Sequence, residues 1–417
     1  MVEMPRSREE GTDMTGNDWD PDLGSDFGEH TGQRIARVRK HRGLSQQALA
    51  AKAKISYSLL SKVESGHKVA SAALVAAVAR ALSEDRAKLD GRPRRGGERR
   101  PDAAHLAIPE IRRVIACIDM APEPEVPPRS LDELTAERNR ARVLLGDAAH
   151  ARLGALLPAS IEELTAHVAE TGDPRAWRLL SNMLSLAFAL SRRLGYHDLG
   201  QVALERASHA AGLGDDPNLP HIADLSRALQ LFTVGSWPLA SRLMRQTAGR
   251  IDQSRPGALH VLTAVHLRGA VAAALAAHGG DAWEHHALAT EAVLRIPGGH
   301  RGDPYGLQAN TSNVQIHGCT VAIEMGDYDQ AIKMDERLVF SPPLSAARRA
   351  HHEIDMARAL TQAGRADRAL KRLFMAEKVA PEMIRFHATA RRVVRQLSSH
   401  YRIIPESLRR LENRMSL

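Results

Sequence analysis

The sequence predicts an all-α protein with a small helical unit near the N-terminus, followed by a long array of helical hairpins. Ala and Leu recur throughout the chain, whereas aromatic residues make up only 4% of it, and this composition favours close-packed helices over sheets. Breaks that contain glycine recur about every 40 residues in the C-terminal part, each between two segments of helical apolar period, which is typical of an α-solenoid. The breaks are Gly195-Tyr196, Gly235-Ser236, Gly279-Gly280, Gly326-Asp327 and Gly364-Arg365.

Length, cysteine content and hydropathy narrow the class of protein. The 417 residues exceed one small domain, so two or three folded units are expected. Two cysteines, Cys117 and Cys319, are too few for a disulfide scaffold or a multi-cysteine zinc module. No stretch approaches about 18 uninterrupted apolar residues, and the N-terminus is acidic without a hydrophobic segment. We therefore expect a cytoplasmic protein that neither is secreted nor binds a membrane.

The charge is distributed unevenly along the chain. Residues 1–30 contain 2 Arg and 9 Asp or Glu, and their lack of an apolar period predicts a disordered acidic tail. Residues 31–104 contain 17 Lys or Arg and only 6 acids. Positive charge concentrated in one short segment favours a nucleic-acid partner. The alternative is a basic linker exposed to water.

The segment 31–85 is expected to form a compact domain of four short helices. The first begins at Gln33 and ends before Gly43, and the second starts after the capping residue Ser45. Ser56 caps the third, which carries Leu59, Leu60 and Val63 and ends at Gly66. The fourth runs from about Ser71 to Leu82.

The rest of the chain divides at two segments rich in Pro, Gly or Arg. Residues 86–104 are basic and rich in Gly and Pro, so we expect a flexible linker. Residues 105–130 contain a short helix and a Pro-rich joint. Residues 131–417 are then expected to form the helical-repeat domain. Its repeats are irregular, and their turns include Met325-Gly326-Asp327-Tyr328 and Ala363-Gly364-Arg365-Ala366.

The segment Thr31 to Leu89 resembles the Cro-type, or xenobiotic-response-element, helix-turn-helix family. The residues that carry the resemblance are Arg34-Ile35-Ala36-Arg37-Val38-Arg39, Gly43-Leu44-Ser45-Gln46, Leu49-Ala50, Ile55-Ser56, Leu60-Ser61 and Glu64-Ser65-Gly66. The resemblance implies a lambda-repressor-like, five-helix DNA-binding domain whose third helix enters the major groove. It also implies an ion pair between Arg39 and Glu64 that holds the first helix to the third.

The residues themselves support contacts with duplex DNA. With Ser56 as cap, the third helix directs one polar side outward, where hydroxyls and a lysine can meet base edges. Gln46 begins the second helix, where its amide and the backbone N–H groups can bind a phosphate. The expected DNA contacts are Arg34, Gln46, Lys54, Ser56, Tyr57, Ser58, Ser61, Lys62 and Lys68. For Arg34 the alternative is an exposed helix face without DNA contact, and for Tyr57 it is packing on the domain's own surface.

Lys54 departs from the family pattern, because the family usually has glycine at this turn. The backbone there tends to adopt positive φ, which costs a lysine about 1 kcal/mol. Either the turn differs here, or the lysine charge contributes to phosphate attraction.

One recognition helix contacts too few bases for genomic specificity, since each good contact discriminates by about 1–3 kcal/mol. We therefore expect a homodimer on a palindromic operator. The whole arrangement resembles actinobacterial regulators that join this domain to tetratricopeptide-like repeats, and it is more distantly similar to peptide-sensing quorum regulators. That resemblance implies a peptide or small-molecule effector in the concave face of the repeats.

Polar stripes on the predicted helices suggest where such an effector would bind. Asn310, Asn313, His317, Thr320 and Glu324 share one face of a helix, and the first helix of each hairpin is expected to line the concave side. The weaker stripes are Arg178, Asn182 and Ser185, and His351, Asp355 and Arg358. The candidate effector residues are Asn182, Asn310, Asn313, His317 and Asp355. The alternative is a wet helix face, or hydrogen bonds between repeats.

No motif for catalysis, a cofactor or a metal is found. The histidine pairs His285-His286 and His351-His352 are adjacent in sequence, so on a helix their side chains diverge by about 100°. No phosphate-binding loop and no serine nucleophile elbow occur. The sequence therefore predicts a non-enzymatic, DNA-binding transcriptional regulator whose repeats dimerise and sense an effector. The alternatives are a helical-repeat interaction scaffold, and an antitoxin or phage-type repressor without an effector.

Overall fold

A computed structural model describes residues 30–68, 70–84, 89, 103–120, 127–297, 303–340, 344–415 and 417 of the chain. All regular elements in these ranges are helices, which confirms the predicted all-α class. The predicted acidic tail (residues 1–30, except His30), nearly all of the basic linker (residues 86–104) and most of the Pro-rich joint lie outside the described residues. Ala103 and Ala104, which we assigned to that linker, belong instead to a helix.

Four short helices form the N-terminal unit, which we call the head. They are α1 (Thr31–His41), α2 (Gln46–Ala53), α3 (Tyr57–Glu64) and α4 (Ala72–Leu82). The side chains of Ser45, Ser56 and Ser71 each accept the backbone N–H three residues later and so cap α2, α3 and α4. The head has its own apolar core, built on side chains from every one of these helices, among them Ile35, Leu49, Leu60, Val75 and Leu82.

The helices after the linker form a single array. Two short helices, α6 (Ala103–Leu106) and α7 (Ile108–Ala116), pack against α9. Hairpins follow as α8 (Leu131–Gly146) with α9 (His150–Thr171), α10 (Pro174–Arg193) with α11 (His197–Leu213), α12 (Leu219–Thr233) with α13 (Trp237–Arg250), α14 (Ala258–Leu275) with α15 (Gly279–Leu294), α16 (Thr311–Met325) with α17 (Tyr328–Asp335), and α18 (Ala346–Gln362) with α19 (Ala366–Val379). The C-terminal helices are α20 (Pro381–Phe386), α21 (Ala388–His400) and α22 (Glu406–Met415). We call α8–α22 the array.

Glycines end four of the helices where the sequence predicts turns. Gly195, Gly235, Gly326 and Gly364 all have φ between 70° and 87°, a conformation that glycine adopts without steric penalty. The break predicted at Gly279-Gly280 is wrong by a few residues. There Ala277 takes the positive φ of 63°, and both glycines lie inside the first turn of α15.

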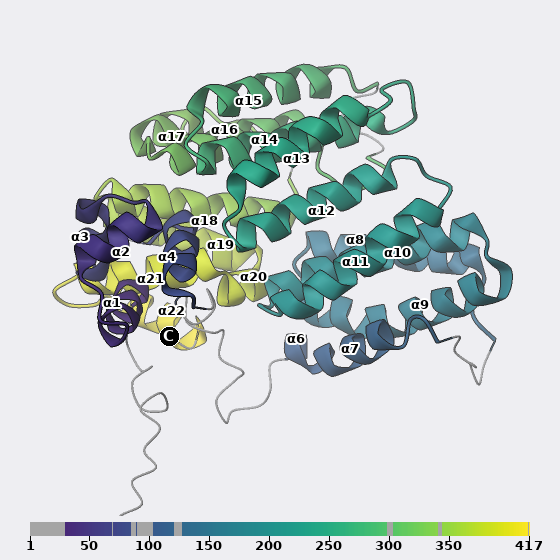
Figure 1. The fold of residues 1–417 in the computed structure, drawn as a ribbon, viewed down its shortest axis with the longest axis horizontal. Coiled ribbons are helices and arrows are strands. Elements are labelled where there is room, and N and C mark those ends of the chain that lie inside the picture. The colour runs from purple at the N-terminus through teal and green to yellow at the C-terminus, as the bar shows by residue number, and fades with distance from the viewer. Residues whose placement is uncertain are drawn as a thin grey trace, which may run out of the picture.

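The array curves until its start and end meet (Figure 1). Helix α8 contacts α18, and the backbone N–H of Ala151 on α9 donates to the Glu382 carboxylate on α20 over 3.1 Å. The inner wall of this ring is formed mainly by the first helix of each hairpin, as the sequence predicts. Among the described helices, α14 alone is long and apolar enough to cross a membrane, but 78% of it is buried inside the protein, as in a core helix.

Candidate DNA-binding face and central cavity

The outer side of α3 is open to solvent. Leu60 and Val63 point into the head core, and this fixes the opposite side of the helix outward. Tyr57 is 50% exposed, and Ser56, Ser58 and Lys62 are exposed as well. Ser61 is half-buried. The residues expected to meet base edges therefore share one accessible side of α3, from its cap Ser56 to Lys62 in its last turn.

An ion pair holds α3 against α1. The Arg39 guanidinium donates from Nε and from its second terminal nitrogen to the two carboxylate oxygens of Glu64, each over 2.8 Å. Both side chains are buried, and hydrogen bonding to Glu64 raises the pKa of Arg39 further. The predicted clamp is therefore present, with the two-pronged geometry that suits a carboxylate.

Gln46 takes part in the same network. Its side-chain amide donates to Glu64 Oε2 over 2.8 Å, and the residue is half-buried at the start of α2. One N–H of the amide is thus bound to the carboxylate, and this bond leaves the second N–H for another acceptor. The first backbone N–H groups of α2 still provide a positive helix end for a phosphate.

Arg34 does not belong to the DNA-binding face, so this prediction is wrong. Its side chain is 2% exposed, and it donates from Nε to the Leu89 carbonyl over 2.9 Å and to the Thr31 hydroxyl over 3.2 Å. One turn of helix separates Arg34 from the buried Val38, so both face inward. The guanidinium ties α1 to the C-terminal end of the head.

The two remaining lysines occupy different surroundings. Lys54 is exposed and ends α2 with φ 54° and ψ 44°, which confirms the predicted left-handed turn. Lys68 is half-buried and lines a small cleft between the head and α21, together with Arg392 and Arg395. In this arrangement Lys68 faces the array.

The head docks onto the array through α4. Arg80 donates to the Gly235 carbonyl over 2.7 Å, and its guanidinium lies 5.9 Å from the centre of the Trp237 ring. At Gly235 the two backbones approach so closely that an added Cβ would lie 2.5 Å from the Cβ of Ala76. The face of α4 opposite the head core is therefore fitted to the turn between α12 and α13.

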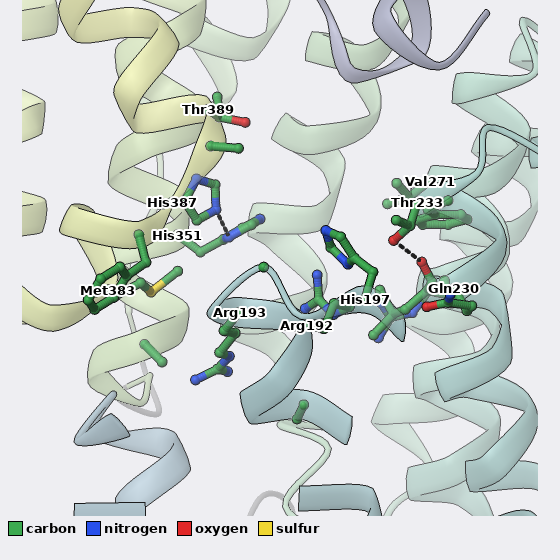
Figure 2. A pocket seen from close by; sticks show the side chains of 18 of the residues that line it. Arg192, Arg193, His197, Gln230, Thr233, Val271, His351, Met383, His387 and Thr389 are labelled. Carbon is green, nitrogen blue, oxygen red and sulfur yellow. Dashed lines mark hydrogen bonds between the residues drawn. The ribbon is translucent and has the colours of Figure 1, made fainter. Parts of the chain in front are cut away.

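A cavity of about 1400 Å³ lies inside the ring, and α4 forms part of its wall. Ala76, Ala79 and Arg80 contribute from the head, and the inner helices α8, α10, α12, α14, α16 and α18 contribute from the array. Figure 2 shows His351 and His387 on one side of this space and Gln230 and Val271 on the other. The volume exceeds that of an ordinary small-molecule site, about 300–1,000 Å³.

The predicted α16 stripe reaches the cavity only at its C-terminal half. His317, Thr320 and Glu324 line it. Asn310 and Asn313 do not line it, and both side chains are engaged in hydrogen bonds within the array. Asn310 caps α16 by accepting the Asn313 N–H over 2.9 Å, and the Asn313 side-chain oxygen accepts from Arg348 over 2.7 Å.

The two weaker stripes differ in whether they line the cavity. His351, Asp355 and Arg358 on α18 all line the cavity. Asn182 on α10 is not among the lining residues, because its amide donates to the Arg178 carbonyl one turn earlier, over 2.8 Å. Asn182 therefore lies outside this cavity, unlike the α18 stripe.

Sequence reasoning missed a group of arginines that lines the cavity: Arg192, Arg193, Arg268 and Arg348. Burial, followed by repulsion from Arg192 and Arg348, lowers the pKa of Arg268 to about 9. Burial also lowers the pKa values of Arg193 and Arg348 to about 10. The feature of the sequence that could have indicated this group is that α10, α14 and α18, each the first helix of its hairpin, carry these arginines.

Three histidines of the cavity, His317, His351 and His387, have lowered pKa values. Burial, then repulsion from Arg348, holds the pKa values of His317 and His351 well below the ordinary value. The pKa of His387 is also well below that value, through burial and then His351, whose Nδ1 lies 3.0 Å from His387 Nε2. Within the described ranges, no three His, Cys, Asp or Glu side chains are grouped to hold a metal ion.

Comparison with known proteins identifies the head. Residues 35–89 match the helix-turn-helix family model. This match supports a DNA-binding transcriptional regulator with a Cro-type head, as the sequence predicts. A search of curated proteins gave no match. The crystal structure of BtubC (BKLC) from P. vanneervenii is similar over 67% of this chain and 96% of that chain, with 14% identity and a TM-score of 0.37, which is too low to define a shared fold in detail.

Proposed function

We propose that this protein is a cytoplasmic, effector-controlled regulator that binds specific DNA through α3 and senses a ligand in the central cavity. One observation carries the proposal: the head presents α3 to solvent while its α4 forms part of the cavity wall. A single small domain thus touches both the expected DNA site and the expected ligand site.

The proposed DNA contacts combine base and phosphate recognition. Lys62 is suited to guanine O6 and N7 in the major groove, and the hydroxyls of Ser58 and Ser61 suit several base edges. Lys54 and the N-terminus of α2 are suited to the flanking phosphates. Tyr57 would contact the backbone or a base from the first turn of α3.

Operator specificity is proposed to come from a homodimer. A few contacts from one α3 distinguish too few base pairs, whereas two copies on a palindromic operator double the number. A rigid dimer also requires a fixed spacing between its two α3 helices, so any change in head position alters affinity.

Ligand control is proposed to act through α4. A ligand that fills the cavity would contact Ala76, Ala79 or Arg80 on α4. It would therefore bind the protein with different affinity when α4 is docked on the array and when it is released. That difference in affinity shifts the head population, and by linkage DNA would change ligand affinity by the same factor. A peptide or a small molecule would both fit the available volume.

The test is a gel shift on the upstream DNA of the gene itself, repeated across a salt series. Wild-type protein is expected to lose affinity as salt rises, because phosphate contacts release counterions. The double variant Tyr57→Ala/Lys62→Ala is expected to lose at least about tenfold in specific affinity. Lys371→Ala, an exposed lysine of the array, is the matched control and should bind normally. Equal binding by the double variant and wild type would refute a role for α3 and would favour a protein-interaction scaffold.

A further inference from the structure

Arginines from three inner helices of the ring line one cavity. Arg192 and Arg193 end α10, Arg268 lies in α14, and Arg348 lies in the first turn of α18. After burial, repulsion from Arg192 and Arg348 contributes to the lowered pKa of Arg268. The array thus brings several positive charges to the same space.

Arg193, Arg268 and Arg348 differ in their partners from Arg358, which lines the same cavity, and from Arg372. Arg358 donates to the Glu324 carboxylate over 2.7 Å, and Arg372 binds the carboxylates of Asp335 and Glu353. The pKa values of both Arg358 and Arg372 are raised. Pairing with carboxylates is therefore the usual solution in this fold.

Arg193 and Arg348 donate to neutral oxygens. Arg193 donates to the Leu145 carbonyl over 2.9 Å. Arg348 donates to the Asn313 side-chain oxygen over 2.7 Å and lies near Asp355, which offsets part of its charge. For Arg268 the described part of the chain provides no hydrogen bond and no ion pair, and the charged groups that lower its pKa are Arg192 and Arg348. Arg268 is half-buried and lines the open cavity, so an anion could reach its guanidinium without displacing a bound carboxylate.

An apolar surface continues from the arginines along the cavity wall. Val271 and Leu275 follow Arg268 at helical spacing i+3 and i+7, and all three line the cavity from one face of α14. Leu229 and Phe232, at the end of α12, line the same cavity. The wall therefore offers a positive part and an apolar part within one continuous space.

We infer that the central cavity binds an amphipathic small-molecule anion, with its phosphate or carboxylate group at Arg268, Arg348 and Arg192 and its apolar body against α12 and α14. Guanidinium groups suit both acids because their N–H donors match two oxygens at once. The neutral histidines His351 and His387 add ring nitrogens at the same wall. The role of this ligand as the effector rests on the proposed function, but its binding does not.

The test uses the full chain and three probes with the same alkyl group: octyl phosphate, octanoate and octan-1-ol. Binding is measured by calorimetry and by the shift in unfolding temperature. At least one anion is expected to bind about tenfold or more tightly than octan-1-ol, because charge-assisted hydrogen bonds form only with the anions. The better anion identifies the headgroup as phosphate or carboxylate. Equal affinity for all three probes would overturn the inference.

Two substitutions sharpen the test. Arg268→Gln is expected to reduce anion affinity about tenfold or more and to leave octan-1-ol binding unchanged. Arg242→Gln removes an exposed arginine of α13 and should change neither. Unchanged anion binding by Arg268→Gln would contradict the assignment of this site.

Stability without ligand provides an independent readout. Because Arg268 is repelled by its neighbours, Arg268→Gln is expected to raise the unfolding temperature of the empty protein by about 2 °C in low-salt buffer. A lower unfolding temperature would contradict the account. None of these measurements uses DNA, so a failure here is separate from a failure of the gel shift.

Discussion

At the scale of single residues, burial decides the role of each charged side chain. Arg34 and Lys54 both belong to the basic segment, yet Arg34 binds backbone inside the head and Lys54 is exposed beside α3. The sequence predicted the Arg39–Glu64 pair through a family pattern and the turn at Lys54 through its expected positive φ. It did not predict the inward position of Arg34, because a basic residue one turn from Val38 also suits an exposed face.

The buried pair of the head gives a prediction for stability. Replacing Glu64 with Ala leaves the Arg39 guanidinium buried without its carboxylate and also removes the partner of Gln46. Removing one member of a buried pair destabilises by about 3–5 kcal/mol. Chemical denaturation of the full chain, followed by a probe in the head, should show this loss. Glu406→Ala, on an exposed pair of α22, is the control and should change stability by less than about 1 kcal/mol. A loss at Glu64 no larger than that of the control would contradict the clamp.

At the scale of elements, helix caps and glycine turns were predictable because each depends on a few neighbouring residues. Ser45, Ser56 and Ser71 cap the helices expected from local pattern. The docking of α4 was not predictable, since the contact between Arg80 and Gly235 joins positions 155 residues apart. The same limit applies to Asn313, whose partner Arg348 lies on another hairpin.

The head–array contact gives a second prediction. Gly235→Ala would place a Cβ against Ala76, and it would also strain a backbone of positive φ. Its matched control is Gly364→Ala, which has a similar φ of 72° but no neighbour within 4 Å of the added Cβ. Both variants should lose about 1 kcal/mol from the strained turn. Gly235→Ala alone should release the head, seen as a larger radius of gyration by X-ray scattering and a changed Trp237 environment by fluorescence.

Scattering curves that were identical for the two glycine variants would show that the approach of Ala76 to Gly235 does not hold the head. A release that also appeared in Gly364→Ala would assign the effect to turn strain alone.

At the scale of the whole molecule, the repeating glycine breaks predicted the array of hairpins and the inward side of each first helix. Closure of the ring was not predictable, because it depends on contacts between α8–α9 and α18–α20 at opposite ends of the array. Because closure could not be predicted, the sequence did not indicate that the arginines at positions 192, 193, 268 and 348 line one cavity. Of the candidate effector residues, His317 and Asp355 line the cavity and the three asparagines do not.

Buried neutral histidines predict a pH dependence of folding stability. Burial, then repulsion from Arg193, lowers the pKa of His150 to about 3, and burial, then His285, lowers that of His266 to about 4. The unfolded chain binds these protons near pH 6.5, so stability is complete above that pH and falls as the pH is lowered toward the folded pKa values. The expected slope is about 1.4 kcal/mol per pH unit for each such histidine between about pH 6 and pH 4.

Denaturation at pH 7.5, 6 and 5 checks this dependence. His150→Gln should reduce the slope by about one proton, whatever its effect on stability at pH 7.5. The control is His167→Gln, which replaces a half-buried histidine and leaves His150 and His266 in place. Stability that stayed level or rose on acidification would contradict neutral burial of these side chains.

The central claim is that the exposed side of α3 contacts bases, and selection of binding sites from a random duplex pool tests it most directly. The full-length wild type should enrich a palindrome with two matching half-sites. Lys62→Ala should relax the preference at one base pair in each half-site, at about 1–3 kcal/mol, whereas Lys371→Ala should leave the enriched sequence unchanged. Enrichment of the same palindrome, with the same preference at every position, by wild type and by a Tyr57→Ala/Lys62→Ala variant would contradict the claim.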